Sequence, residues 1–258
     1  MTQRIISGNV KRAGEADVGL WSQIQRWRYN EREFPASWRA ILDAHYPAYA
    51  TLGPEDRLAF ESHLKHFVWT KNWEGAKGLE VTEEMKVLVA AAAARIARRL
   101  PFDVYDNLES IVIYPRTFSH EEGAATLGLA HKWGTVVLSW DSVTHGIEIP
   151  DDAQDTAIHE FAHVLDFENG GADGTPLLED GRQYAGWVRV MSRYFEALRE
   201  GGSIASVMDD YGATNEAEFF AVATEAFFER PLALKKVAPE LYGELSLFYR
   251  VDPIEDQG

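Results

Sequence analysis

Two short runs of apolar and β-branched residues lie in the middle of the chain, between segments with helical periodicity. They cover residues 110–114 (SIVIY) and 135–140 (TVVLSW), and turn residues bound both of them. Runs of this length and composition favour strands, whereas the flanking apolar spacing favours helices. We therefore expect an α+β fold that is mostly helical, with a small mixed sheet at its centre.

Helices are predicted on both sides of these strands. Before the strands they begin near Pro35, at Glu55 and at Thr82, and after them they cover residues 152–167, 181–199, 215–229 and 239–249. Proline residues, Gly-Gly pairs and the N-cap residue Thr82 mark most of the ends. Because no repeat or linker-like tract divides the chain, we expect residues 34–258 to form a single domain. Residues 1–33 are expected to form an arm or helix packed on it.

The composition restricts the possible chemistry. The 258 residues include no cysteine, and 46% of them are hydrophobic. This is typical of a globular protein with a sizeable core, and it excludes disulfides, thiolate nucleophiles and cysteine-rich metal sites. Any metal ion must therefore be held by His, Asp and Glu. The formal net charge of −16 disfavours direct contact with nucleic acid.

Neither a secretory signal nor a membrane span is evident in the sequence. The amino terminus lacks the apolar run of a signal peptide, and the longest apolar run covers only residues 87–94. A bilayer-spanning helix needs about 20 apolar residues. We expect a cytoplasmic protein with no membrane partner.

The most informative motif is HEFAH at residues 159–163. In a helix, His159 and His163 stand on one face, one turn apart, so both imidazoles can reach a single ion. Zinc suits such a site, and Glu160 would act as the general base and acid on a water molecule next to the ion. The alternative is a partly buried helix whose two histidines are satisfied by hydrogen bonds.

A third zinc ligand is needed. The metzincin pattern would place a glycine and a third histidine at positions held here by Asp166 and Asn169, so that arrangement is excluded. Glu218 and Glu225 share a face of the helix predicted over residues 215–229, and their spacing does not separate them as candidates. For Glu216, near the start of that helix, interaction with the helix dipole is the better interpretation.

The chain resembles the Mlc titration factor A family of zinc metallopeptidases, which are gluzincin-like. The resemblance extends from about Phe34 to Pro253. It is carried by the HEFAH motif and by residues 34–39, 73–80, 136–141, 165–166, 185–187 and 211–222. It implies a zincin-like metallopeptidase fold, with the small sheet next to the zinc-binding helix, and one Zn²⁺ per chain.

The resemblance also implies roles for individual residues. His159, His163 and Glu218 correspond to the metal ligands, Glu160 to the catalytic base, and Tyr211 to a group that stabilises the transition state. Such a phenol can donate a hydrogen bond to an oxyanion, although Tyr211 is also able simply to anchor its loop. The implied function is aminopeptidase-like hydrolysis of short peptide substrates. The alternative implied function is regulatory binding that sequesters a transcriptional repressor protein.

Other polar residues remain open at the sequence level. Asp166 or Glu225 is expected to orient a ligating imidazole. The strand over residues 136–140 either pairs with an extended peptide or is an ordinary internal strand. The 119–134 loop, with His120 and His131, is a candidate gate, and His63 with His66 is a weaker metal-binding pair. Asp209 and Asp210 are candidates for attracting a substrate ammonium group.

Overall fold

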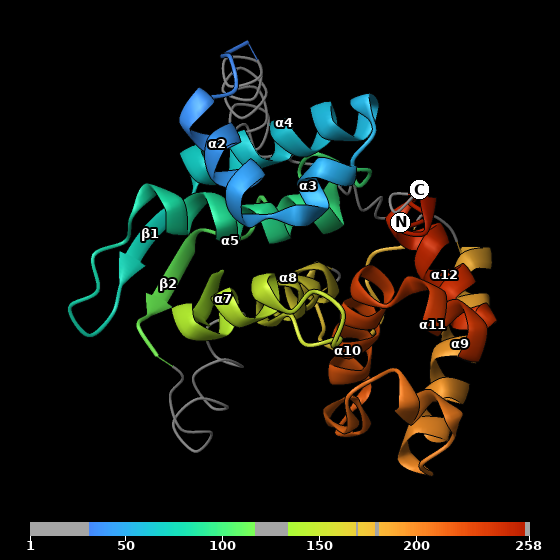
Figure 1. The fold of residues 1–258 in the computed structure, drawn as a ribbon. Coiled ribbons are helices and arrows are strands. Elements are labelled where there is room, and N and C mark those ends of the chain that lie inside the picture. The colour runs from blue at the N-terminus through green and yellow to red at the C-terminus, as the bar shows by residue number, and fades with distance from the viewer. Residues whose placement is uncertain (1–30, 117–133, 169, 179–180, 256–258) are drawn as a thin grey trace, which may run out of the picture. The chain divides into compact units, whose positions relative to one another are not determined.

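The computed structural model describes residues 31–116, 134–168, 170–178 and 181–255 (Figure 1). Contacts within the chain divide it into Met1–Glu33 and Phe34–Gly258. The arm predicted over residues 1–33 lies almost wholly outside the described residues. Most of the candidate gate, including His120 and His131, also lies outside them, so the domain assignment and the gate stay predictions.

Four helices fill the first third of the described chain. They are α2 (Ala36–His45), α3 (Pro47–Thr51), α4 (Pro54–Thr70) and α5 (Glu83–Ala97). The three predicted helices are confirmed, and α3 is an additional short one that begins at Pro47. The Thr82 side chain caps α5 by accepting a hydrogen bond from the Met85 amide at 3.2 Å. Helix α5 is almost entirely buried, with a run of alanines at its centre that allows close packing.

The sheet has three described strands in the order β1 (Asn72–Gly75), β2 (Ser110–Tyr114) and β3 (Thr135–Ser139). All pair in parallel, with Trp73 opposite Ile111 and Ile111 opposite Val136. The expectation of a mixed sheet is therefore wrong for the described strands. Helix α5 carries the chain back between β1 and β2, which is the crossover that parallel pairing requires. Strand β1 was not predicted because its sequence, NWEG, has no β-branched residue.

The second half of the described chain is helical. Its elements are α7 (Trp140–Glu148), α8 (Thr156–Phe167), α9 (Gly181–Arg199), the 3₁₀ helices η1 (Ser203–Ser206) and η2 (Asp210–Ala213), α10 (Glu216–Glu229), α11 (Pro231–Val237) and α12 (Pro239–Tyr249). Helix α8 begins four residues later than predicted, because the Asp155 side chain caps it by accepting from the Ala157 and Ile158 amides at 2.9 and 3.0 Å. Helices α7 and α11 were not predicted.

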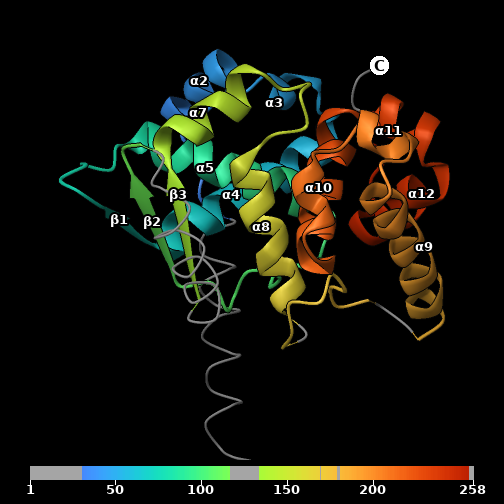
Figure 2. The same cartoon turned by 90° about the horizontal axis from the view of Figure 1, so that it is seen from below.

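Helix α8 lies between the sheet and the C-terminal helices, alongside α10 (Figures 1 and 2). Ile158, Phe161 and Ala162 are fully buried in the core. Phe161 meets the edge of the Phe67 ring of α4 at 5.2 Å between centroids. No helix in the described parts of the chain is both long and apolar enough to cross a membrane.

The loop after α8 is held between the end of that helix and the start of α10. The buried Asp166 carboxylate accepts a hydrogen bond from the Gly174 amide at 2.9 Å, and the Trp187 indole donates to the Gly174 carbonyl at 3.0 Å. Gly174 has φ +75°, and a Cβ there would lie 2.3 Å from the Glu216 carbonyl oxygen. Only glycine therefore permits this close approach of the loop to α10.

Replacing Gly174 by alanine should destabilise the protein strongly. Gly170→Ala is the matched control, because Gly170 also has positive φ (+90°) but nothing lies within 4 Å of its Cβ position. The control should cost about 1–2 kcal/mol of unfolding free energy from the left-handed backbone alone. Gly174→Ala should cost about 1–3 kcal/mol more because of steric overlap. Chemical denaturation measures both values, and equal losses would contradict the proposed loop packing.

Candidate metal centre

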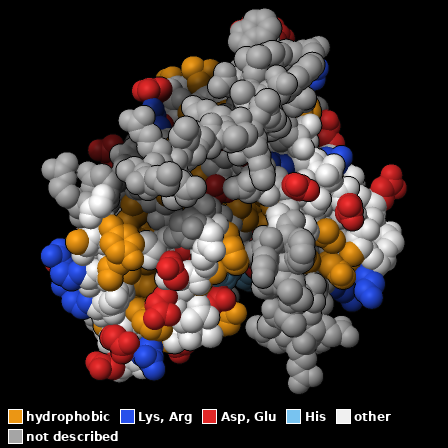
Figure 3. All heavy atoms as spheres, turned by 180° about the vertical axis from the view of Figure 1, so that it is seen from behind, with side chains coloured by type: hydrophobic (Ala, Val, Ile, Leu, Met, Phe, Trp, Pro, Cys, Tyr) orange, Lys and Arg blue, Asp and Glu red, His pale blue; other side chains and the backbone are white. Residues whose placement is uncertain are grey.

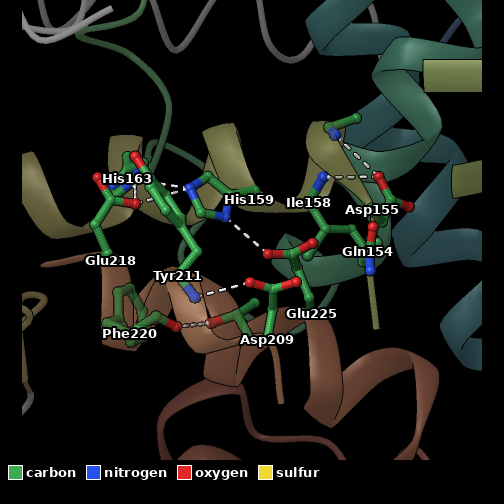
Figure 4. A network of polar contacts seen from close by, with 12 residues as sticks. Gln154, Asp155, Ile158, His159, His163, Asp209, Tyr211, Glu218, Phe220 and Glu225 are labelled. Atoms are coloured by element: carbon green, nitrogen blue, oxygen red, sulfur yellow. Dashed lines mark hydrogen bonds and ion pairs between the residues drawn. The ribbon is translucent and has the colours of Figure 1, made fainter. Parts of the chain in front are cut away.

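Helix α8 presents two imidazoles toward α10. His159 and His163 stand one turn apart, with ring centroids 4.8 Å apart, and their Nε2 atoms lie 3.1 Å from each other (Figure 4). His163 is buried and His159 is half-buried. Both rings lie side by side as the helical spacing predicts.

Helix α10 supplies a carboxylate to the same point. Asn215 caps this helix by accepting from the Glu218 amide at 3.0 Å, which fixes Glu218 in the first turn. Its Oε2 atom lies 3.0 Å from Nε2 of His159 and 3.2 Å from Nε2 of His163. In the described part of the chain, these three residues form the one group whose geometry suits a metal ion.

The dimensions of this triangle fit a zinc ion. Zinc–nitrogen bonds of about 2.0–2.1 Å at tetrahedral angles separate neighbouring ligand atoms by about 3.3 Å. The three observed separations of 3.0–3.2 Å are close to that value. The same three atoms are also within hydrogen-bond distance of one another, so in the metal-free protein protons on the imidazoles satisfy the Glu218 carboxylate.

A second carboxylate of α10 orients His159. Glu225 Oε1 lies 2.7 Å from Nδ1 of His159, on the side of the ring away from Glu218. Helical spacing alone did not distinguish Glu218 from Glu225 as the third candidate ligand. In the structure Glu218 faces both Nε2 atoms, whereas Glu225 faces the Nδ1 atom of His159. Burial raises the pKa of Glu225 to about 7, although the charge of His159 acts against this shift.

In the metal-free site, the ionisable side chains shift one another's pKa values. Burial lowers the pKa of His159, but the Glu225 charge and hydrogen bonds to both carboxylates outweigh it, so the net shift is well upward. Burial lowers the pKa of His163. Burial raises the pKa of Glu218, yet hydrogen bonds from the two histidines bring it well below its ordinary value. Glu218 is thus a carboxylate, ready to accept a cation.

Tyr211 and Glu160 border this triangle. The Tyr211 ring lies 6.0 Å from the His159 ring, and its half-exposed hydroxyl hydrogen-bonds to Glu218. Burial and the charges of Glu218 and Glu160 raise the pKa of Tyr211, so its hydroxyl keeps its proton and can donate it. Glu160 is buried, and its negative charge acts on both histidines and on Tyr211.

The other residues singled out from the sequence make different contacts. Asp209 accepts from the Tyr211 amide at 2.7 Å, so it caps η2 and orients Tyr211. Asp166 holds Gly174 and does not orient an imidazole in the contacts described above. His63 packs on Phe102 at 4.8 Å, and burial lowers its pKa to about 4, whereas His66 faces Asp106 at 3.6 Å.

Sequence reasoning missed the contacts at the start of α8. The backbone amide of Gln154 donates to Glu229 Oε2 at 3.0 Å, and the Asp155 backbone donates to Glu225. The spacing of Glu225 and Glu229, four residues apart on one helix, was available in the sequence. Their partners were not, because backbone amides carry no sequence signature.

A family model described as "Glucose-regulated metallo-peptidase M90" matches residues 21–250, which include all the residues of the candidate site.

Three curated proteins are similar over most of their length. An uncharacterized protein of Synechocystis sp. is 30% identical, with 91% of this chain and 90% of that protein covered. The protein named Mlc titration factor A of Edwardsiella ictaluri is 30% identical, with coverage of 81% and 85%. The protein of the same name from Serratia proteamaculans is 33% identical, with coverage of 69% and 73%.

Zinc binding to the candidate site should release a proton. In the metal-free protein each ring nitrogen of His159 faces a carboxylate, and its raised pKa keeps both nitrogens protonated near neutral pH. Zinc replaces the Nε2 proton, so its affinity should rise with pH, by about tenfold per pH unit. Calorimetry in buffers of different ionisation enthalpy counts the protons released. His63→Phe should leave the count unchanged, and binding without proton release would contradict this protonation state.

Proposed function

Since the chain belongs to the glucose-regulated metallo-peptidase M90 family, we propose that it is a zinc-dependent peptidase in which His159, His163 and Glu218 hold one Zn²⁺ ion. The observation that carries this proposal is the triangle of their ligand atoms, with sides of 3.0–3.2 Å. The position of α8 beside a small sheet supports a zincin-like fold. The absence of cysteine is compatible with this ligand set, which leaves a position open for water and substrate.

Glu160 is the proposed general base and acid. A bound zinc ion would supply Lewis-acid activation of water and of the scissile carbonyl. Glu160 takes a proton from the attacking water and delivers it to the leaving amine. Its burial within the same turn of α8 as His159 and His163 supports this role, because a buried carboxylate near the reacting atoms exchanges protons with little competition from solvent.

Tyr211 is the proposed donor to the oxyanion. Its hydroxyl already hydrogen-bonds to Glu218, and its pKa is raised, so it remains a donor at neutral pH. Asp209 accepts from the backbone amide of Tyr211 at 2.7 Å and thereby fixes the backbone that carries the ring. A donor fixed in advance stabilises developing negative charge without a reorganisation cost.

Short peptides with a free amino terminus are the proposed substrates. The support is the aminopeptidase-like activity that the resemblance in the sequence implies, together with the charge of −16. Acidic side chains are spread across the face shown in Figure 3, where basic ones lie mainly near the edges. Such a surface attracts a substrate ammonium group through long-range electrostatics.

A regulatory function is the second candidate. Two of the relatives above carry the name Mlc titration factor A, and the resemblance to that family implies regulatory binding. In this chain, binding of a transcriptional repressor would then act beside or instead of peptide hydrolysis. A variant that cannot hydrolyse peptides but keeps its surface separates the two functions.

Glu160→Gln should keep zinc and lose peptide hydrolysis. The substitution preserves size but removes the proton acceptor, so kcat should fall about 10²–10⁴-fold. Turnover of a short peptide with a free amino terminus measures this loss, with the N-acetylated peptide expected to be a poor substrate. Glu168→Gln, at the C-cap of the same helix, is the control. Wild-type turnover by Glu160→Gln would refute the catalytic assignment.

Tyr211→Phe should lower kcat about 10²–10³-fold while zinc content stays at one ion per chain, because a single oxyanion donor is lost. The control is Tyr184→Phe, since Tyr184 is an exposed tyrosine of α9. Steady-state kinetics with metal analysis of each variant tests the assignment. An unchanged kcat for Tyr211→Phe would leave Tyr211 with a packing role only.

A further inference from the structure

Two carboxyl groups of α10 hold the chain segment that leads into α8. Glu225 and Glu229 lie one helical turn apart. Glu229 Oε2 accepts from the Gln154 amide at 3.0 Å, an amide that also donates to Asp152 Oδ1 at 3.0 Å, and Glu225 accepts from the backbone of the next residue, Asp155. Figure 4 shows Gln154 and Asp155 next to Glu225, at the end of α8 away from His163.

These contacts lie at one end of the α8–α10 helix pair, and Glu218 lies at the other end. Glu218 is in the first turn of α10 and meets His163, whereas Glu229 is the last residue of α10 and meets the residue two positions before α8. The two helices therefore run in opposite directions. The relative position of the helices along their axes decides whether Glu218 reaches both imidazoles, and the Glu229 contact restricts sliding at the far end.

The surroundings of Glu229 do not suggest a role in an ion pair. Its side chain is 5% exposed, and Oε1 has no hydrogen-bond partner among the described residues. Arg95 is the nearby cation, but its Nη2 donates to the Phe228 carbonyl at 2.6 Å. Burial and the charge of Asp155 raise the pKa of Glu229 to about 9. The group is therefore a neutral acid near pH 7, and its described hydrogen bond is the one to Gln154.

We infer that Glu229 is a positioning residue for the metal centre: by holding the Gln154 amide it fixes the start of α8 against α10, and so sets His159 and His163 relative to Glu218. The inference rests on the proposed zinc site. Among the contacts of the described residues, Glu229 reaches the Gln154 backbone and not the proposed ligands, so it acts through the backbone. Pre-organised ligands bind a metal more tightly than ligands that must first be ordered.

The test compares Glu229→Gln with Glu229→Met. Both replacements are close to glutamate in size, but only glutamine keeps an oxygen that can accept from Gln154. Glu61→Gln is the control for loss of a buried carboxylate elsewhere, since Glu61 of α4 bonds Tyr49 and Arg39 at 2.5 and 3.0 Å. Zinc affinity is measured by competition with a chromophoric chelator. Hydrogen exchange of the amides of residues 154–158 is measured on the metal-free proteins.

We expect Glu229→Met to bind zinc about tenfold more weakly than wild type, with faster exchange at residues 154–158. Glu229→Gln and Glu61→Gln should remain within about twofold of wild type in zinc affinity. If folded Glu229→Met binds zinc as tightly as wild type, or if Glu61→Gln weakens binding equally, the inference is overturned and the proposed function stands. If wild type binds no zinc, the proposed function itself fails.

Failure of Glu229→Met to fold would not end the test. In the metal-free protein, the Gln154 amide should exchange as slowly as amides inside α8, both in wild type and in Asp152→Ala, because Glu229 still accepts from it when the second acceptor, Asp152, is removed. An unprotected Gln154 amide in either protein overturns the inference without any substitution of Glu229.

Discussion

The antiparallel packing of α8 against α10 is the interaction on which the candidate site depends. Each helix alone carries groups that are costly to bury: two imidazoles and Glu160 on α8, and three carboxyl groups on α10. His159, His163, Glu218 and Glu225 satisfy one another through contacts of 2.7–3.2 Å, and Glu229 accepts from the Gln154 amide. The apolar faces of both helices lie in the core, so the polar groups meet in a medium that strengthens their interaction.

The same packing gives neighbouring carboxyl groups different states. Glu218 meets two imidazoles and remains ionised, whereas burial raises the pKa of Glu225 to about 7 and that of Glu229 to about 9. One helix thus supplies an anionic carboxylate that faces both imidazoles, a carboxyl group that orients one imidazole, and a neutral acid that accepts from a backbone amide. Environment assigns these roles, since the three side chains are chemically identical.

The sequence predicted the parts of this arrangement that depend on local periodicity. The HEFAH spacing placed His159 and His163 on one face, and the helix over residues 215–229 was expected to bring Glu218 or Glu225 toward them. Strands β2 and β3 followed from their β-branched residues. The parallel direction of the sheet, strand β1 and the roles of Asp166 and Glu229 depend on non-local contacts, often with backbone groups. Such contacts leave no pattern along the chain.

The decisive measurement is a crystal structure of the zinc-loaded protein, with the ion located from anomalous diffraction at the zinc edge. We expect one ion per chain, with the Nε2 atoms of His159 and His163 and a carboxylate oxygen of Glu218 at about 2.0–2.2 Å. Glu225 should remain on Nδ1 of His159, as it is in the metal-free site. An ion bound elsewhere, or one whose coordination shell excludes Glu218, would refute the proposed zinc site.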